Sequence, residues 1–296
     1  MRSVGGRVVL RFEDLDPDRA KVEWIDRQLE DLTWLGLDWD GPPRRQSTDV
    51  ARIERAAQTL FEKGLAYPCV CTRKEVQAAI SAPHAGESHG AYPGTCRGRF
   101  DSLEEAFEVT GRRACLRLRV EPGKTSFTDE IHGLQTLDVE QDAGDFPITR
   151  RDGLAAYQLA VVVDDEHDGV THVLRGDDLV DSTFRQRLLA EALGHDRVPE
   201  YWHVPLVVDD AGRRLAKRTQ GLSLATLRDE GVSAERLVGW VLRSLGVDVR
   251  TTLSASDALE LFDGDAFARA LRSRGEPERF GQMERGSLGH EGYPRR

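Results

Sequence analysis

The spacing of apolar residues along the chain predicts its helices. Every third or fourth residue is apolar over 20–35 and again over 49–63, which is the period of an amphipathic helix. A glycine directly follows each segment, as is common where a helix ends. We expect Asp16 or Asp18 to cap the first of these helices. The remaining predicted helices are 73–80, 103–109, 182–193, 223–229 and 233–245.

Short apolar runs between these helices predict strands. The run 8–12 is short, apolar and rich in β-branched residues, which predicts a buried strand, and we expect another buried strand over 170–176. Residues 114–120 alternate between apolar and polar positions, as in a strand with one buried face. Residues 125–140 predict a β-hairpin, and 203–208 predict a further strand. Strands interleaved with helices are typical of an α/β fold.

Composition limits the class of protein. The chain has 296 residues, of which 39% are hydrophobic, and no apolar run reaches the ~18 residues of a membrane span. The first residues contain no apolar signal-peptide core, so we expect a soluble cytoplasmic protein with no membrane association. The net charge of −10 argues against a nonspecific nucleic-acid coat. It allows a specific binder, because phosphate contacts need only a few well-placed Arg or Lys side chains.

Three of the four cysteines lie within one short stretch, as Cys69, Cys71 and Cys96. A Cys-x-Cys pair with a third thiolate from a returning loop supplies three of the four ligands of a tetrahedral Zn²⁺ site. The alternative is that these thiols pack as small buried side chains. The intervening loop over 81–98 is long for a compact domain unless something fixes it, which favours zinc.

The residues around this stretch leave the fourth ligand open. Tyr92, His84 and His89 all lie between the second and third cysteines and could each complete the site. The fourth cysteine, Cys115, falls within the alternating segment 114–120, and we expect it to belong to the core.

Charged residues at the ends of predicted strands are candidates for ligand binding. Glu13 follows the run 8–12, and ligands of open α/β sheets bind beside the carboxyl ends of strands, so Glu13 could hold a ligand ammonium. Arg175 closes the run 170–176 and could take a carboxylate through two hydrogen bonds. An ion pair with Asp177 or Asp178 is the alternative. The cationic loop that contains Lys217 could hold phosphates.

Three segments resemble motifs of the glutamyl/glutaminyl class I aminoacyl-tRNA synthetases. Residues 10–16 resemble LRxEDLD, residues 152–165 resemble DGxxAYQLAVVVDD, and residues 171–179 resemble THVxRGxDL. The resemblance covers residues 5–245. It implies a class I synthetase Rossmann-type catalytic core with a small zinc-binding insertion and C-terminal helices.

The resemblance also implies roles for individual residues. Glu13 would hold the ammonium group of L-glutamate, and Tyr157 and Arg175 would complete the amino-acid pocket. Lys217 matches the second lysine of the family's KMSKS-type loop, and it would be the catalytic cation that steadies the phosphates of ATP and its Mg²⁺ as pyrophosphate leaves.

The cysteine pattern is similar to the zinc site of the family's short paralogue, glutamyl-Q tRNA(Asp) synthetase. In that site a tyrosine is the fourth ligand, which favours Tyr92 and gives Cys69, Cys71, Tyr92 and Cys96 as the metal set. Few patterned residues follow Leu245, so a helical anticodon-binding domain is not expected. This implies a monomeric enzyme that activates L-glutamate with ATP and transfers it to queuosine of tRNA(Asp).

The chain departs from the family pattern at its beginning. Family members begin earlier, with a strand and a His-x-Gly-His motif, which none of the eight histidines forms. We therefore expect an N-terminally truncated core, and three hypotheses follow. The sequence is a shortened version of an active enzyme, a catalytically inactive synthetase-derived protein that binds tRNA or a partner, or a core fragment of a glutamyl-tRNA synthetase that charges the tRNA 3′ end.

The predicted organisation has five parts. These are the first part of the catalytic core (1–65), the zinc-binding insertion (66–140), the second part of the core (141–220), a helical region (221–272) and a disordered tail (273–296).

Overall fold

The structure is a computed structural model. It describes residues 2–17, 20–80, 91–208, 223–249 and 252–261, together with 263, 264, 267, 269, 271–272 and 278–279. Of the predicted tail, only 278–279 are therefore described. No helix in the described ranges is long and apolar enough to cross a membrane.

Helices and strands alternate over most of the described chain. The α-helices are α1 (Val22–Trp34), α2 (Val50–Glu62), α3 (Arg73–Ile80), α4 (Leu103–Thr110), α5 (Tyr157–Asp168), α6 (Val180–Leu193), α7 (Leu224–Asp229), α8 (Ala234–Ser244) and α9 (Ala255–Leu261). The strands are β1 (Arg11–Phe12), β2 (Arg44–Arg45), β3 (Ala66–Cys69), β4 (Cys115–Leu118), β5 (Lys124–Asp129), β6 (Gly133–Asp138), β7 (Phe146–Pro147), β8 (His172–Gly176), β9 (Glu200–Val204), β10 (Val207–Val208) and β11 (Glu278–Arg279).

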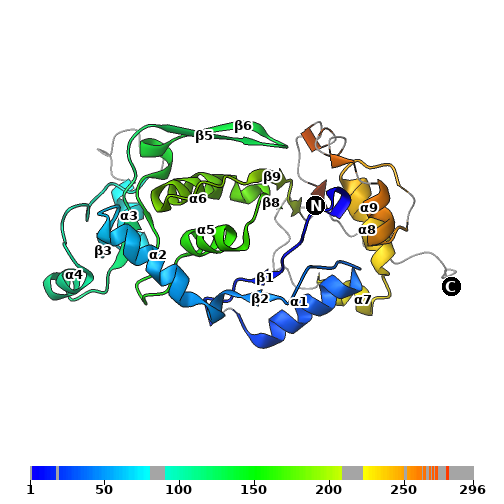
Figure 1. Ribbon diagram of the computed structural model, residues 1–296, viewed down its shortest axis with the longest axis horizontal. Coiled ribbons are helices and arrows are strands. Elements are labelled where there is room, and N and C mark those ends of the chain that lie inside the picture. The colour runs from blue at the N-terminus through cyan, green and yellow to red at the C-terminus, as the bar shows by residue number, and fades with distance from the viewer. Residues whose placement is uncertain are drawn as a thin grey trace.

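The largest sheet has the strand order β6-β5-β9-β8. Strands β8 and β9 are parallel over their whole length, and β5 joins β9 in parallel at the pair Asp129 and Tyr201. Strands β5 and β6 form the predicted hairpin, and Gly133 takes the left-handed φ of 71° that its tight turn requires. Helices α5 and α6 lie against each other, on one side of the hairpin in Figure 1. The α/β fold predicted from the alternation is confirmed.

A second sheet carries the cysteines. It is antiparallel with the order β3-β4-β7, and its register places Cys69 opposite Cys115. The region of β3, α3 and α4 lies at one end of the long axis of the molecule, and α8 and α9 lie at the other (Figure 1). Two short parallel pairs, β1 with β2 and β10 with β11, complete the sheets in the described ranges.

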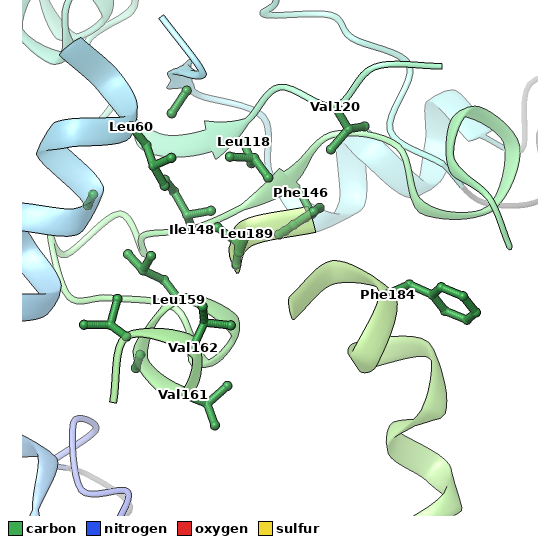
Figure 2. Close-up of a cluster of buried hydrophobic side chains, with 14 of the residues drawn as sticks. Leu60, Leu118, Val120, Phe146, Ile148, Leu159, Val161, Val162, Phe184 and Leu189 are labelled. Carbon is green, nitrogen blue, oxygen red and sulfur yellow. The ribbon is translucent and has the colours of Figure 1, made fainter. Parts of the chain in front are cut away.

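The main core lies where α2, α5 and α6 meet the two larger sheets. The apolar run in α5 is buried from Leu159 to Val163, because the helix is covered by α2 on one side and α6 on another. Figure 2 shows these side chains converging from several elements. The labelled members are Leu60, Leu118, Val120, Phe146, Ile148, Leu159, Val161, Val162, Phe184 and Leu189.

Burial of three predicted strands differs from expectation. Of the run 8–12, only Phe12 is buried, and only its last two residues are in a strand. Strand β8 is an edge strand, so Val173 packs on the core while Leu174 is 65% exposed on the other face. Conversely, β4 is buried on both faces, because Arg117 is covered by Tyr92 instead of facing solvent.

The boundaries of two elements also differ. Helix α1 begins after Lys21, which provides no side-chain cap, so Asp16 is not its cap, and Asp18 lies outside the described residues. Asp16 instead accepts a hydrogen bond from Arg150 (2.9 Å). The predicted strand 203–208 is split into β9 and β10 by Pro205, which cannot donate a backbone hydrogen bond.

Candidate active site and metal centre

Arg175 lies near the carboxyl end of β8 and is held in a fixed orientation. Its Nε donates to Nε2 of His203 (3.0 Å), and its Nη2 donates to Oγ1 of Thr183 (2.6 Å) and to the Leu179 carbonyl oxygen (3.3 Å). Because these bonds involve two different nitrogens of a planar group, they fix the plane of the guanidinium. A guanidinium fixed in this way is preorganised for a carboxylate ligand.

Glu13 follows β1 directly and is placed by its neighbour Arg11. The largely buried Arg11 donates to Asp165 (2.7 Å) and Asp168 (3.1 Å) of α5, and so ties β1 to that helix. The nearest oxygen of Glu13 is 3.8 Å from Nη2 of Arg11. The Glu13 side chain is still 43% exposed, so its carboxylate is accessible to a ligand.

Tyr157, the first residue of α5, completes a group of three with Glu13 and Arg175. We call these three residues, whose role in binding an amino acid is a prediction, the amino-acid pocket. Partial burial raises the pKa of Glu13, against the attraction of Arg11, and the nearby Asp165 adds to the increase. Burial likewise raises the pKa of Tyr157, where Glu13 acts in the same direction and the positive charge of Arg175 opposes it. These mutual effects indicate that the three side chains lie near one another.

The charges of the amino-acid pocket suit a zwitterion. Burial also raises the pKa of Asp165, and the neighbouring Asp164 adds to the increase, so several carboxyl groups lie on the Glu13 side of the pocket. A ligand ammonium would relieve this repulsion, and Arg175 offers a positive group for a carboxylate on the same ligand. Lys217, the predicted phosphate-binding residue, lies outside the described residues.

Three sulfur atoms meet next to the antiparallel sheet. The Sγ atoms of Cys69, Cys71 and Cys96 all lie within 4.8 Å of one another. Cys69 is the last residue of β3, and Cys71 follows two residues later, while Tyr92 and Cys96 come from the segment that returns after α3. We call these four residues the cysteine cluster. His84 and His89, the alternative fourth ligands, lie outside the described residues.

The geometry of the cysteine cluster fits a tetrahedral zinc ion. The hydroxyl oxygen of Tyr92 is 3.4 Å from Sγ of both Cys69 and Cys71, and Sγ of Cys71 is 3.5 Å from Sγ of Cys96. A Zn–S bond of ~2.3 Å in a tetrahedron separates its ligand atoms by about 3.5–4 Å. Cys69 and Cys96 are fully buried, which would protect such an ion from solvent.

Two further side chains surround the cysteine cluster. The guanidinium of Arg117 lies 3.8 Å from the centroid of the Tyr92 ring, in a cation–π contact, and donates to the Asp145 carbonyl oxygen (2.7 Å). A hydrogen bond from Cys115, assisted by Arg117, holds the pKa of Cys69 well below its ordinary value. Cys115 is outside the group of three sulfurs and is buried in β4, as the alternating pattern predicted.

Some residues around these sites were not singled out by the sequence pattern. Arg11 and Asp165 lie within two of the quoted motifs, and this position was the sequence feature that could have indicated their place near the site. His203 lies within β9 and Asp129 is the last residue of β5, and both are buried titratable side chains, which require a partner. Arg117 was placed on the solvent face, because alternation alone does not reveal a second layer over a strand.

Comparisons with known proteins identify the family of this chain. Residues 1–285 match the family model described as tRNA synthetases class I (E and Q), catalytic domain. The chain belongs to this family of class I synthetases. Among curated members of the family, the glutamyl-Q tRNA(Asp) synthetase of Nitratidesulfovibrio vulgaris is 46% identical over 256 residues, which are 83% of this chain and 78% of that protein. The glutamyl-Q tRNA(Asp) synthetase of Nocardia farcinica is 47% identical, over 84% of this chain and 77% of its own.

Longer family members are less similar. The glutamate–tRNA ligase of Synechococcus sp. is 36% identical over 91% of this chain and 57% of its own length. A crystal structure of the glutamate-tRNA synthetase of Elizabethkingia anophelis superposes with a TM-score of 0.75 at 24% identity. It covers 97% of this chain, and this chain spans 64% of that structure, slightly less than two thirds. The superposition shows that this synthetase fold is shared.

Proposed function

We propose that this chain activates L-glutamate with ATP and transfers it to queuosine of tRNA(Asp). The observation that carries the proposal is the amino-acid pocket. Glu13 would hold the substrate ammonium and Arg175 a substrate carboxylate, with Tyr157 at the margin. This arrangement of charges supports a zwitterionic amino acid as the substrate.

The proposed reaction has two steps. The α-carboxylate of glutamate attacks the α-phosphorus of ATP, and the bond to the β-phosphate oxygen breaks, which releases pyrophosphate and forms glutamyl-adenylate. A hydroxyl of the queuosine ring then attacks the glutamyl carbonyl carbon, loses its proton, and displaces AMP. In the first step Lys217, with Mg²⁺, would neutralise the charge that develops on the leaving pyrophosphate.

Zinc is the metal that the cysteine cluster fits best, and its proposed ligands are Cys69, Cys71, Tyr92 and Cys96. Three sulfurs and a phenol oxygen form a closed set of four ligands, which is typical of a structural zinc ion. Such an ion would supply folding stability to the β3–β4 region and take no part in adenylate formation.

The first experiment is ATP–pyrophosphate exchange by this chain with L-glutamate and without tRNA. Exchange that depends on glutamate, and is absent with L-glutamine or L-aspartate, is the expected result. Binding of tRNA without any exchange would instead support an inactive synthetase-derived binding protein.

A second experiment distinguishes the site of transfer. The names of the most similar relatives support queuosine, while the glutamate–tRNA ligases favour the tRNA 3′ end as the alternative. Radiolabelled glutamate would be offered to tRNA(Asp) with queuosine, tRNA(Asp) without it, and queuosine-containing tRNA(Asp) that lacks the 3′-terminal adenosine. We expect labelling of the first and third. Labelling of the first two alone would show 3′-end charging.

A further inference from the structure

A fully buried pair of titratable side chains lies behind Arg175. Asp129, at the end of β5, and His203, in β9, are both 0% exposed. Nδ1 of His203 is 2.6 Å from Oδ2 of Asp129, and the backbone N–H of His203 donates to the same oxygen (3.2 Å). Nε2 of His203 accepts from Nε of Arg175 (3.0 Å). The three residues form a continuous chain, Asp129–His203–Arg175, across three neighbouring strands.

The hydrogen-bond directions in this chain determine the tautomer of His203. A guanidinium has only donors, so Nε2 of His203 must present a lone pair to Arg175. The proton of the imidazole therefore lies on Nδ1, where it is donated to Asp129. Only a carboxylate at position 129 offers two acceptor oxygens, one for the ring and backbone N–H groups of His203 and one for the backbone N–H groups that follow Asp129.

The Asp129 carboxylate is itself fixed by the backbone. Its Oδ1 accepts from the N–H groups of Ile131 (3.0 Å) and His132 (2.8 Å), in the turn between β5 and β6. Burial opposes ionisation, but the hydrogen bonds from His203 and from these two amides outweigh it and lower the pKa of Asp129. The carboxylate is thus a rigid, ionised acceptor whose position is set by the hairpin.

We propose that Asp129 and His203 are positioning residues that hold Arg175 in the orientation needed to bind the glutamate carboxylate. The inference rests on the proposed function, because it assigns Arg175 to the substrate. The bond from Nη2 of Arg175 to Thr183 would by itself allow the guanidinium to rotate about that contact. The bond from Nε of Arg175 to His203 prevents this rotation. The β5–β6 turn therefore controls a site on β8 through two buried side chains.

The first test is Asp129→Asn in the full chain. An amide nitrogen in place of Oδ2 would be a donor that faces the two donors of His203, its backbone N–H and its Nδ1–H. The imidazole would therefore move its proton from Nδ1 to Nε2, so that Nδ1 could accept from the amide. Nε2–H would then face Nε–H of Arg175, and the guanidinium would be displaced. We expect KM for glutamate in pyrophosphate exchange to rise about tenfold or more, with KM for ATP changed less than about twofold.

A matched control is Asp145→Asn. Asp145 is also a buried carboxylate that accepts from an arginine, Arg97 (3.0 Å), but it lies beside the antiparallel sheet. We expect this variant to lower the melting temperature without changing the ratio of the two KM values. If both variants changed that ratio equally, the role of Asp129 would be purely structural and the proposal would be wrong.

A pair of His203 variants adds a rescue test. His203→Leu removes both hydrogen bonds at similar volume, and His203→Gln retains an acceptor for Arg175. We expect the Leu variant to raise KM for glutamate as much as Asp129→Asn does, and the Gln variant to raise it less. Equal effects of Leu and Gln would contradict the proposal.

The tautomer can be measured independently of activity by ¹H–¹⁵N NMR of the imidazole. We expect Nδ1–H in the unsubstituted chain and Nε2–H in Asp129→Asn, with a slowly exchanging Arg175 Nε–H only in the former. The opposite tautomer in the unsubstituted chain would overturn the proposal. Absence of pyrophosphate exchange with the expected tautomer present would show instead that the proposed function is wrong and that the pair holds Arg175 for another purpose.

Discussion

The cysteine cluster and the amino-acid pocket are built in different ways. All four members of the cluster come from residues 69–96, and the two buried cysteines are fully enclosed. The pocket takes Glu13, Tyr157 and Arg175 from segments far apart in the sequence, and its side chains are partly exposed. Burial of the cluster therefore suits an ion that stays bound, whereas the exposure of the pocket would allow a ligand to enter and leave.

The two sites also depend on different supporting contacts. The cluster is supported by the β3–β4 pairing, Cys115 and Arg117. The pocket is held by long-range polar contacts, from Arg11 to α5 and from Arg175 to β9. We therefore expect substitutions in the cluster to change stability and metal content, and substitutions in the pocket to change substrate binding. The predictions below test this separation, beginning with the largest effect.

Arg175→Ala should give the largest loss of activity. Arg175 is the positive group proposed to bind the substrate carboxylate, so its removal should lower kcat/KM for glutamate about 100- to 1000-fold. Zinc content, measured by inductively coupled plasma mass spectrometry, should be unchanged. Arg175→Lys keeps the charge without the planar fork and should recover only a small part of the activity. Loss of zinc from either variant would contradict the separation of the two sites.

Cys69→Ser should lower the zinc content and the melting temperature together. Loss of one thiolate from a buried structural site should reduce the melting temperature by about 5–10 °C. Cys115→Ser is the matched control, because Cys115 lies beside the cluster but outside the three sulfurs, and it should retain the metal. KM for glutamate of the folded Cys69→Ser protein should change little. If neither zinc content nor melting temperature changed, these thiols would be ordinary core side chains.

Binding of glutamate should weaken at acidic pH through Glu13. The pKa of Glu13 is raised, mainly by partial burial, so this carboxylate takes up its proton at a higher pH than an ordinary glutamate side chain. Because the ammonium requires the ionised form, KM for glutamate should be constant above this raised pKa and increase as pH falls through it. Glu13→Gln should raise KM roughly tenfold at neutral pH and flatten the profile. A profile identical in the two proteins would exclude Glu13 as the titrating group.

Arg112→Ala should have the smallest effect. Arg112 pairs with Glu75 (2.9 Å) near the cysteine cluster, but both side chains are exposed. Exposed ion pairs contribute about 0–1 kcal/mol, so the melting temperature should fall by no more than about 2 °C. Zinc content should stay the same. A fall as large as that of Cys69→Ser would mean that the surface pair holds the cluster together.

The prediction of elements from the sequence succeeded where local periodicity decides the structure. The amphipathic helices α1 and α2 and the hairpin of β5 and β6 follow directly from apolar spacing. It was wrong where a second layer decides burial. Arg117 was expected to face solvent and is covered by Tyr92, and Leu174 was expected in the core but lies on the open face of an edge strand.

The sequence by itself determined the α/β fold, the family and the residues proposed for each site. Its motifs contain Glu13, Tyr157 and Arg175, and the spacing of the cysteines indicated a metal site. Only the tertiary structure decided how Arg175 is oriented, since Asp129 and His203 reach it from strands that are remote in sequence. The physical reason is that periodicity and motifs record local preferences, whereas the direction of a buried hydrogen bond depends on which strands become neighbours.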